Sequence, residues 1–437
     1  MKIRLPELEI PEDAGFSRDF DMFERKAYGV RLLDIIQRAD DNLVIGLDAA
    51  WGEGKSTFIS MWSGHLRQND VPLVVYDAFT NDYQESAFIA LASCVYDAIP
   101  EKETERREEF LSKATSLGKI LLRSSARIAT RAALGVAIDD SAFESASVES
   151  EGAALVDQLI ASKIAGAQQE KEERAAFRAA LSELAGSGND GSKLVFVIDE
   201  LDRCRPAFAL EIIECVKHFF AVPGVSFVLV MNRTQVEESV RCTYGQGIDA
   251  HTYLQKFVNL WTALPSKGNG VLSGAQLYMR NCLGRMGFEV QTQEQNVVVE
   301  QFDQLIGHYR MTLREIEKAL TNFAIVSNAI NSRMYSHYYI LTVFLAVLKV
   351  VRPGVYADLA KELLDYKSLS ERAGLVSLVD EYWSREEGCY LRFLLCGYLG
   401  TDAQRESLSD FSSLMEFRRS ENPVANIIKW METLEYT

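Results

Sequence analysis

The chain has few of the side chains that build disulfide frameworks or structural metal sites. Among its 437 residues are seven cysteines and five histidines. The cysteines are scattered with no CxxC pair, and no two histidines have the spacing of metal ligands. An odd number of scattered cysteines indicates reduced thiols in a cytoplasm, and it argues against disulfides and against a zinc site.

Long apolar runs are also missing. Residues 1–6 contain no apolar core of the length found in a signal peptide. The longest apolar run, 338–351, includes Thr342 and Lys349, and it is shorter than the roughly 20 residues that a membrane-spanning helix needs. We therefore expect a buried helix there, and a cytoplasmic protein with no transmembrane segment.

Positive charge is scarce. The chain has 46 lysines and arginines against 62 aspartates and glutamates, which gives a formal net charge of −16. A surface this acidic repels phosphate backbones, which argues against nucleic-acid binding over a broad face but leaves a local basic patch open. The length fits two or three domains.

Strand-like and helix-like segments alternate through the first part of the chain. Short apolar runs predict buried parallel strands at 43–47, 73–76, 193–198 and 225–231. Helical patterns lie between them, and a lead-in helix is predicted over 16–40. The alternation predicts an α/β fold with a parallel sheet and right-handed crossovers.

The same patterns divide the chain into three predicted parts. Residues 1–98 and 191–265 form an α/β core. Residues 99–190, which are rich in charge and in alanine, form an inserted helical arm. Residues 266–437 show mainly helical periodicity and form an α-helical C-terminal domain.

A glycine-rich loop follows the first predicted strand and precedes a helix. It comprises Trp51, Gly52, Glu53, Gly54, Lys55, Ser56 and Thr57. The amides of such a loop and the helix dipole bind phosphates, with Lys55 reaching the β- and γ-phosphates and the Ser56 hydroxyl on Mg²⁺. The consensus G-x-x-x-x-G-K-[ST] begins with glycine where this chain has Ala49, so that position needs a backbone conformation open to L-residues. The loop predicts a P-loop NTPase fold that takes ATP and Mg²⁺.

Two adjacent carboxylates follow the buried strand at 193–198. Asp199 ends this apolar run, and Glu200 comes next. We expect Asp199 to hold Mg²⁺ through water and Glu200 to act as the general base toward the attacking water. A glutamate directly after the aspartate favours the additional-strand class of P-loop enzymes, in which another strand lies between the two motif strands. The run at 225–231 is the natural candidate for that strand.

Three further polar residues near these motifs are candidates for catalysis. Asn232 follows the run at 225–231, where it is either a sensor of the γ-phosphate or an ordinary residue at a strand end. Arg203 or Arg205 is either an arginine finger or an ion-pair partner of Asp202 or Glu211. The binding site for the base has no motif, and Arg25 and Tyr28 in the lead-in are guesses for it.

The two motifs together resemble the KAP family of P-loop NTPases. Its members share W-G-x-G-K-[ST] and I-D-[DE]-L-D-R-C motifs, which stand here at 51–56 and 198–204. The similarity covers about 16–265 and is followed by a helical remainder. In the family that remainder carries an arginine-bearing helix that can face the nucleotide. The resemblance therefore implies Arg314 as a candidate second sensor, with a solvent-facing arginine as the alternative.

The resemblance also implies a biological setting. Many bacterial members lie in mobile elements or anti-phage defence clusters beside a partner protein, and many carry transmembrane helices between the two motifs. Here the insertion lacks a spanning segment but carries a basic stripe over 113–131, formed by Lys113, Lys119, Arg123, Arg127 and Arg131. This stripe suits a membrane surface, a nucleic acid or an acidic partner. A solvated face, or one that pairs with the protein's own carboxylates, is the alternative that we favour.

These observations lead us to expect an ATP-binding and ATP-hydrolysing KAP-type switch of conformation or assembly, in anti-phage defence. A homo-oligomer, a partner protein encoded nearby, or both are expected. The alternatives are an ATP-organised scaffold with little hydrolysis and a nucleic-acid-stimulated translocase. The sequence does not separate ATP from GTP.

Overall fold

The structure is a computed structural model of the whole chain. It describes residues 1–6, 8–39, 41–133, 151–186, 193–265, 272–289, 293–329, 336–375, 390–406 and 422–432. Statements about elements and contacts refer to these residues.

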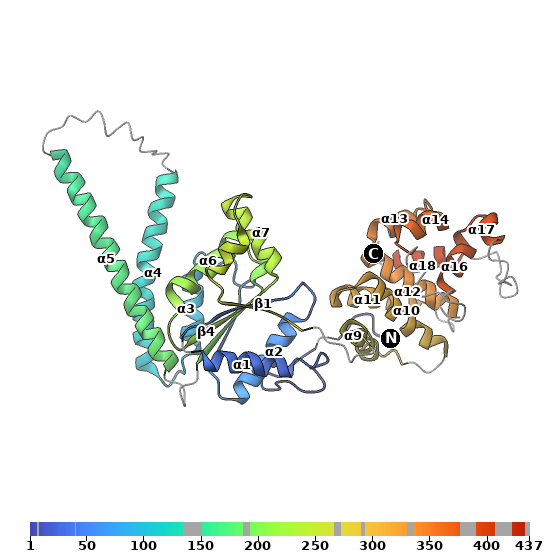
Figure 1. Cartoon of the computed structure of the whole chain (residues 1–437), viewed down its shortest axis with the longest axis horizontal. Helices are drawn as coiled ribbons and strands as arrows, with labels where there is room; N and C mark the ends of the chain where they lie inside the picture. The colour runs from blue at the N-terminus through green and yellow to red at the C-terminus, as the bar shows by residue number, and fades with distance from the viewer. Residues whose placement is uncertain are drawn as a thin grey trace.

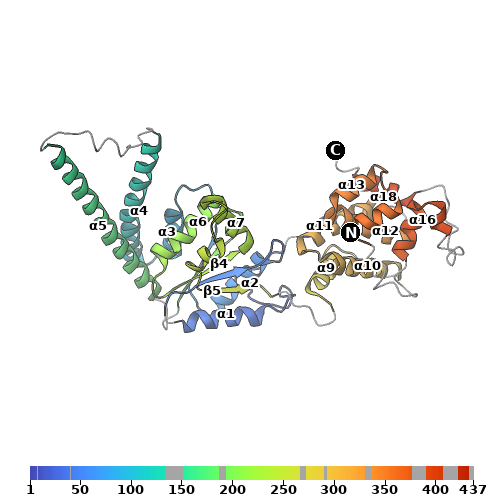
Figure 2. The ribbon, with the colours of Figure 1, turned by 45° about the horizontal axis from the view of Figure 1, so that its top comes forward.

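A five-stranded parallel sheet forms the centre of the first part of the chain (Figure 2). Its strands are β1 (Val44–Asp48), β2 (Leu73–Asp77), β3 (Leu194–Asp199), β4 (Val225–Met231) and β5 (Leu260–Ala263). Their order across the sheet is β2-β3-β4-β1-β5, with every neighbouring pair parallel. The strand β4 therefore separates the strand before the glycine-rich loop from the strand that ends in Asp199, as predicted from the sequence.

Helices cover both faces of this sheet (Figure 1). They are α1 (Lys26–Arg38), α2 (Lys55–Gln68), α3 (Ala87–Ala98), α6 (Pro206–Cys215), α7 (Arg233–Tyr244) and α8 (Ala250–Gln255). Along β3, Val195 and Val197 pack with α1 and α2 on one face, whereas Phe196 and Ile198 pack with α3, α6 and α7 on the other. Burial on both faces explains why the strands appear in the sequence as continuous apolar runs.

Two features of this core differ from expectation. The predicted lead-in helix is wrong for its first half, because α1 begins only at Lys26. Glu24 has a left-handed φ of 51°, and the Asp21 carboxylate accepts hydrogen bonds from the backbone N–H groups of Arg25 and Lys26, so the chain is held outside a helix before that point. The edge strand β5 was not predicted, because it is short and its ends are exposed.

The insertion forms a long pair of helices that projects from the core (Figure 1). They are α4 (Thr104–Ala133) and α5 (Glu151–Gly186). At their base, the Phe177 ring of α5 lies 5.1 Å from Phe88, 5.5 Å from Phe110 and 5.3 Å from Phe220, between ring centroids. A cluster of aromatic rings therefore attaches the helix pair beside α3.

The remainder of the chain is helical in the residues that the structure describes. Its helices are α9 (Gly274–Arg285), α10 (Gln293–Tyr309), α11 (Leu313–Ala329), α12 (Ser336–Val351), α13 (Pro353–Ala360), α14 (Tyr366–Arg372), α16 (Tyr390–Leu399), α17 (Asp402–Glu406) and α18 (Pro423–Glu432). The long apolar run predicted as a buried helix is α12, which lies in the core of this helical part. None of the described helices has the length and hydropathy to cross a membrane.

The N-terminal segment lies against these C-terminal helices. The backbone N–H of Lys2 donates to the Met286 carbonyl at 2.7 Å, and the Asn328 side chain donates to the Met1 carbonyl at 2.8 Å. The chain thus connects its α/β and helical parts at a second place besides the segment after β5. The boundaries at 98, 191 and 266 stay predictions.

Candidate functional site

The glycine-rich loop joins β1 to α2, and two of its glycines have left-handed backbones. Gly52 has φ 83° and Gly54 has φ 75°, and Gly54 is the N-cap of α2. Ala49, at the position where the consensus has glycine, is buried and lies outside the left-handed region. Alanine is therefore tolerated there, and the loop delivers the free N–H groups of the α2 N-terminus to one open side, where an anion binds favourably.

Lys55 lies inside the loop with its ammonium group already partnered. Its Nζ donates to the Ala49 carbonyl at 2.9 Å and to the Ala50 carbonyl at 3.4 Å, and it lies 3.5 Å from Asp202 Oδ2. The lysine is only 8% exposed. A phosphate that enters the loop would compete with these acceptors for the ammonium group.

Asp202 connects the loop to the acidic motif. The sequence did not reveal this connection. The indole Nε1 of Trp51 donates to Asp202 Oδ2 at 2.5 Å. The Asp202 side chain is 1% exposed, and its other oxygen, Oδ1, has no hydrogen-bond partner in the described structure. The Trp51 side chain thus bonds to the acidic motif, which leaves its backbone as the part available to phosphate.

Asp199 and Ser56, the two predicted Mg²⁺ ligands, lie close enough that the Ser56 hydroxyl lowers the pKa of the Asp199 carboxyl. Burial raises the pKa of Asp199, while the Ser56 hydroxyl, the Glu200 amide and the Lys55 charge oppose that shift. Asp77, the register partner of Asp199 on β2, adds negative charge and raises the pKa further. A buried carboxylate beside a hydroxyl and a second carboxylate fits a hard cation, which would offset this concentration of charge.

Glu200, the predicted base, is paired with Arg203. The Arg203 guanidinium lies 2.8 Å from Glu200 Oε1, and Glu200 itself has a left-handed φ of 57°. Burial raises the pKa of Glu200, and the Arg203 charge partly counters it. Neither Asp202 nor Glu211 is the ion-pair partner of Arg203, so those expected pairings are wrong.

Arg205 lies in an ion pair away from the loop. Its Nε donates to Asp82 Oδ1 at 2.9 Å, while the Glu211 carboxylate accepts a hydrogen bond from the Ala87 amide. The expectation that Arg205 pairs with Asp202 or Glu211 is therefore also wrong, and of the two arginines Arg203 is the one that lines the cavity beside the loop.

Asn232 follows β4 directly and precedes α7. Its side chain makes no capping hydrogen bond to α7. Because β4 lies between β1 and β3, the carboxyl end of β4 comes between the loop and Asp199. The position suits a sensor of phosphate, and that role stays a prediction.

A cavity of about 370 Å³ lies above the α2 N-terminus. Its walls come from the loop, from the N-terminal segment, and from α9 and α11; they include Gly52, Gly54, Lys55, Ser56, Thr57, Phe23, Arg203, Tyr278, Arg285 and Arg314. Volumes of roughly 300–1,000 Å³ are typical of small-molecule sites. Arg314, in the first turn of α11, is thus brought to the loop, while its sensor role stays a prediction.

The two residues guessed for the base have other partners. The Tyr28 hydroxyl bonds to the Thr262 hydroxyl of β5 at 3.0 Å and does not line the cavity. Arg25 lines the cavity, but its guanidinium is hydrogen-bonded to backbone carbonyls of the loop. The cavity wall includes Phe20, Phe23 and Tyr278, aromatic side chains for which sequence reasoning gave no role in the site; the Phe23 and Tyr278 rings lie 6.3 Å apart and nearly parallel.

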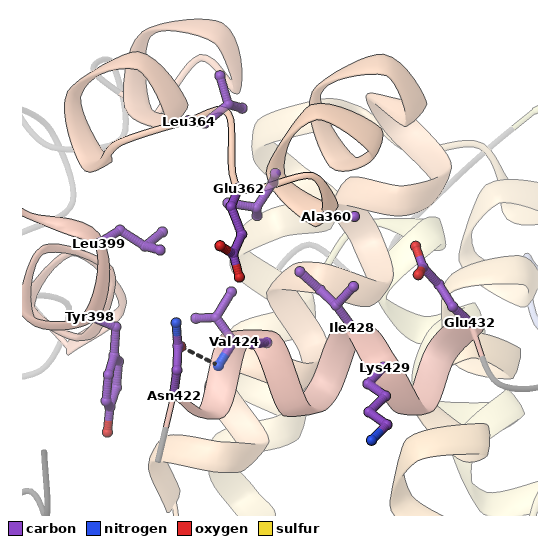
Figure 3. A pocket seen from close by; sticks show the side chains of 12 residues that line it. Ala360, Glu362, Leu364, Tyr398, Leu399, Asn422, Val424, Ile428, Lys429 and Glu432 are labelled. Atoms are coloured by element: carbon purple, nitrogen blue, oxygen red, sulfur yellow. Dashed lines mark hydrogen bonds between the residues drawn. The ribbon is translucent and has the colours of Figure 1, made fainter. Parts of the chain in front are cut away.

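Two other cavities lie away from the loop. One, of about 630 Å³, lies between α18, α16 and the segment after α13, and Figure 3 shows Glu362, Asn422 and Lys429 around it. The other, of about 320 Å³, lies between α3 and α4 and has mostly apolar walls that include Lys119 of the basic stripe. The side chains of the stripe beyond Lys119 fall outside the described residues. Neither cavity includes a predicted phosphate or Mg²⁺ ligand.

The strand order, the loop and the aspartate at the end of β3 define a P-loop NTPase fold of the additional-strand class. The sequence model described as the KAP family P-loop domain matches residues 25–330, so this chain belongs to the KAP family. A search of curated proteins finds no match to the chain. Among solved structures, the Aeropyrum pernix ORC2 protein, in ADPNP-ADP complexes, is similar at 12% identity and a TM-score of 0.38, over 98% of each chain. No role for this chain follows from a TM-score of this size.

Proposed function

We propose that this protein binds ATP with Mg²⁺ and hydrolyses it as a switch of conformation or assembly. The observation that carries the proposal is the convergence of Lys55, the neighbouring side chains of Ser56 and Asp199, and Glu200 at one edge of the sheet. These groups come from segments about 140 residues apart, and together they are the parts that phosphoryl transfer needs.

Each residue has a role in this reaction. The loop amides and Lys55 bind the β- and γ-phosphates, and Ser56 and Asp199 would hold Mg²⁺ with water and phosphate oxygens as its other ligands. Bound Mg²⁺ would supply positive charge against the developing charge on the phosphates. Glu200 accepts a proton from the water that attacks the γ-phosphorus, and the bond from that phosphorus to the bridging oxygen of ADP breaks.

The cavity supports the switch part of the proposal. Its walls combine the loop with Arg314 of α11 and Arg285 of α9. A triphosphate attracts these arginines more strongly than a diphosphate does, so turnover would change how the helical part rests on the loop. A cytoplasmic protein of bacterial origin, a role in anti-phage defence, and a homo-oligomer or a partner encoded nearby are what the family resemblance suggests.

Replacement of the general base tests hydrolysis directly. Glu200→Gln should keep ATP binding while turnover falls by at least about 10²-fold, the usual reach of a general base. ATP binding and phosphate release would be measured together. Glu238→Gln, a matched change at an exposed ion pair on α7, should leave turnover unchanged. Wild-type turnover in Glu200→Gln would refute the assignment.

An ATP-organised scaffold with little hydrolysis is the second candidate. The pairing of Glu200 with Arg203 favours it, because the Arg203 charge lowers the pKa of Glu200 and so weakens it as a base. Negligible phosphate release together with ATP-dependent oligomerisation would support this alternative. A translocase would instead need the basic stripe over 113–131 to contact nucleic acid, and a salt-sensitive stimulation of turnover by DNA or RNA would reveal it.

A further inference from the structure

Arg25 is a buried cation beside the phosphate loop. It precedes α1, it is 2% exposed, and its guanidinium lies 4.4 Å from the centre of the Phe23 ring. Burial lowers the pKa of Arg25 to about 10, so the side chain is still charged at neutral pH. A buried charge of this kind is costly unless every donor is directed to an acceptor.

The acceptors of Arg25 are backbone carbonyls from two distant segments. Its Nη2 donates to the Glu53 carbonyl at 3.0 Å, and its Nη1 donates to the Gly54 carbonyl at 3.2 Å. Its Nε donates to the Pro265 carbonyl at 2.9 Å. One guanidinium thus joins the phosphate loop to the segment that leaves β5 for the C-terminal helices.

The bonds from Arg25 help to fix where the loop amides point, and the Gly54 carbonyl also accepts a hydrogen bond from the Phe58 N–H at 3.1 Å. In a planar trans peptide, the carbonyl of one residue and the N–H of the next point in opposite directions. Carbonyls of Glu53 and Gly54 that are held toward Arg25 therefore direct the N–H groups of Gly54 and Lys55 away from it. Those two N–H groups lie at the start of α2, where phosphate oxygens need donors.

We propose that Arg25 is a positioning residue that fixes the phosphate-binding orientation of the loop and couples the loop to the Pro265 segment. The proposal rests on the proposed function for its effect on nucleotide affinity, but the coupling itself needs no nucleotide. A rearrangement of the loop would change the acceptors of Arg25, and the same side chain would transmit that change to the segment that leads toward α9.

The first test measures backbone order without nucleotide. Hydrogen–deuterium exchange would be followed at residues 50–57 and at Leu264, the amide next to Pro265, which donates to the Asp48 carbonyl, in the wild type, Arg25→Lys and Arg25→Ala. Exchange in both segments should rise together, by roughly tenfold for loss of bonds to a charged group. Arg25→Lys places a charge there with a shorter, non-planar donor set, so it should be intermediate. Exchange unchanged in both segments, or raised in only one, overturns the proposal.

The second test measures nucleotide binding with a fluorescent ATP analogue and Mg²⁺. Arg25→Ala should raise Kd by about 10- to 100-fold, and Arg25→Lys by less. The matched control is Arg178→Ala, because Arg178 of α5 also donates to two backbone carbonyls, those of His218 and Ala221. The control should lower the melting temperature without changing Kd.

These readouts separate the two proposals. A wild type that does not bind ATP removes the proposed function, while the exchange measurement still decides on Arg25. A folded Arg25→Ala with wild-type Kd and wild-type exchange overturns the positioning role. Should Arg25→Ala fail to fold, the decision rests on Arg25→Lys, whose Kd and exchange must both depart from the wild type.

Discussion

The phosphate loop and the α4–α5 helix pair are attached to the same core in different ways. The loop is held by directional polar bonds, from Lys55 to carbonyls, from Trp51 to Asp202 and from Arg25 to the loop backbone. The helix pair is attached at its base by a cluster of packed phenylalanine rings, with Arg178 of α5 donating to the His218 and Ala221 carbonyls beside it. Directional bonds fix atoms to within a fraction of an ångström, whereas apolar packing tolerates exchange of similar shapes. Small changes in the loop should therefore have large effects, and charge changes on the helix pair should have small ones.

Removal of the loop lysine should have the largest effect. Lys55→Ala deletes a charge-assisted hydrogen bond to phosphate, so Kd for ATP should rise by about 10- to 100-fold. Binding would be measured by calorimetry. Lys193→Ala is the matched control, because Lys193 also donates to a backbone carbonyl, that of Ile36, at the start of β3. Equal losses in both variants would show that the effect comes from folding.

Asp202→Asn should have a smaller effect of opposite sign. The Asp202 carboxylate competes with phosphate for the Lys55 ammonium group. Asparagine keeps an acceptor for Trp51 but removes the charge, so ATP should bind about 3- to 10-fold more tightly. The same binding assay checks it. Weaker binding would show that the bond between Trp51 and Asp202 depends on charge and shapes the loop.

The pH dependence of turnover should show how the ion pair with Arg203 changes the pKa of Glu200. A general base works only when ionised, and burial raises the pKa of Glu200 above its ordinary 4.5. Turnover should therefore fall as the pH drops toward this raised pKa. The acid limb of the profile of kcat against pH should lie above pH 4.5. Arg203→Gln removes a charge that lowers this pKa, so the acid limb should move to higher pH.

At pH 8 the same Arg203→Gln variant should change kcat by less than about threefold, because Glu200 stays ionised there. Profiles of kcat against pH for the two proteins would be compared. A loss of about 10³-fold or more at every pH would instead identify Arg203 as an arginine finger.

Charge reversal on the helix pair should have the smallest effect. Lys113→Glu with Lys119→Glu changes the described part of the basic stripe on α4, one of the two helices that project from the core (Figure 1). Basal turnover and Kd for ATP should stay within about twofold of wild type, as is usual for surface charges outside a site. A larger loss of basal turnover would contradict the expectation that the helix pair is less sensitive to substitution than the loop.

The sequence predicted those parts of the fold that depend on local pattern. Strands buried on both faces leave continuous apolar runs, and the loop needs glycines at fixed spacing, so β1, β3, β4 and the α2 N-terminus could be read directly. The edge strand β5 carries no such run, because its ends are exposed. The lead-in helix failed because its aromatic residues pack without helical geometry, as Phe16 does against Phe58.

The rest of the site depends on pairs that are distant in the sequence. Trp51 and Asp202 are 151 residues apart, and Arg25 and Pro265 are 240 apart. A single sequence contains no sign that such residues meet. The motifs predicted that Lys55, Ser56, Asp199 and Glu200 lie at one edge of the sheet. The contacts of Arg25 with the loop backbone and of Asp202 with Trp51 could be found only from the three-dimensional structure.

Gly52 allows the loop backbone to lie very close to α11. A Cβ atom on Gly52 would come within 2.9 Å of the Arg314 Cβ, so loop backbone and helix meet with no side chain between them. Even one methyl group at this position would clash with α11 and push it away from the loop. The substitution would also strain the backbone, which has a φ of 83°. The absence of a side chain at Gly52 therefore lets α11 lie directly against the loop backbone.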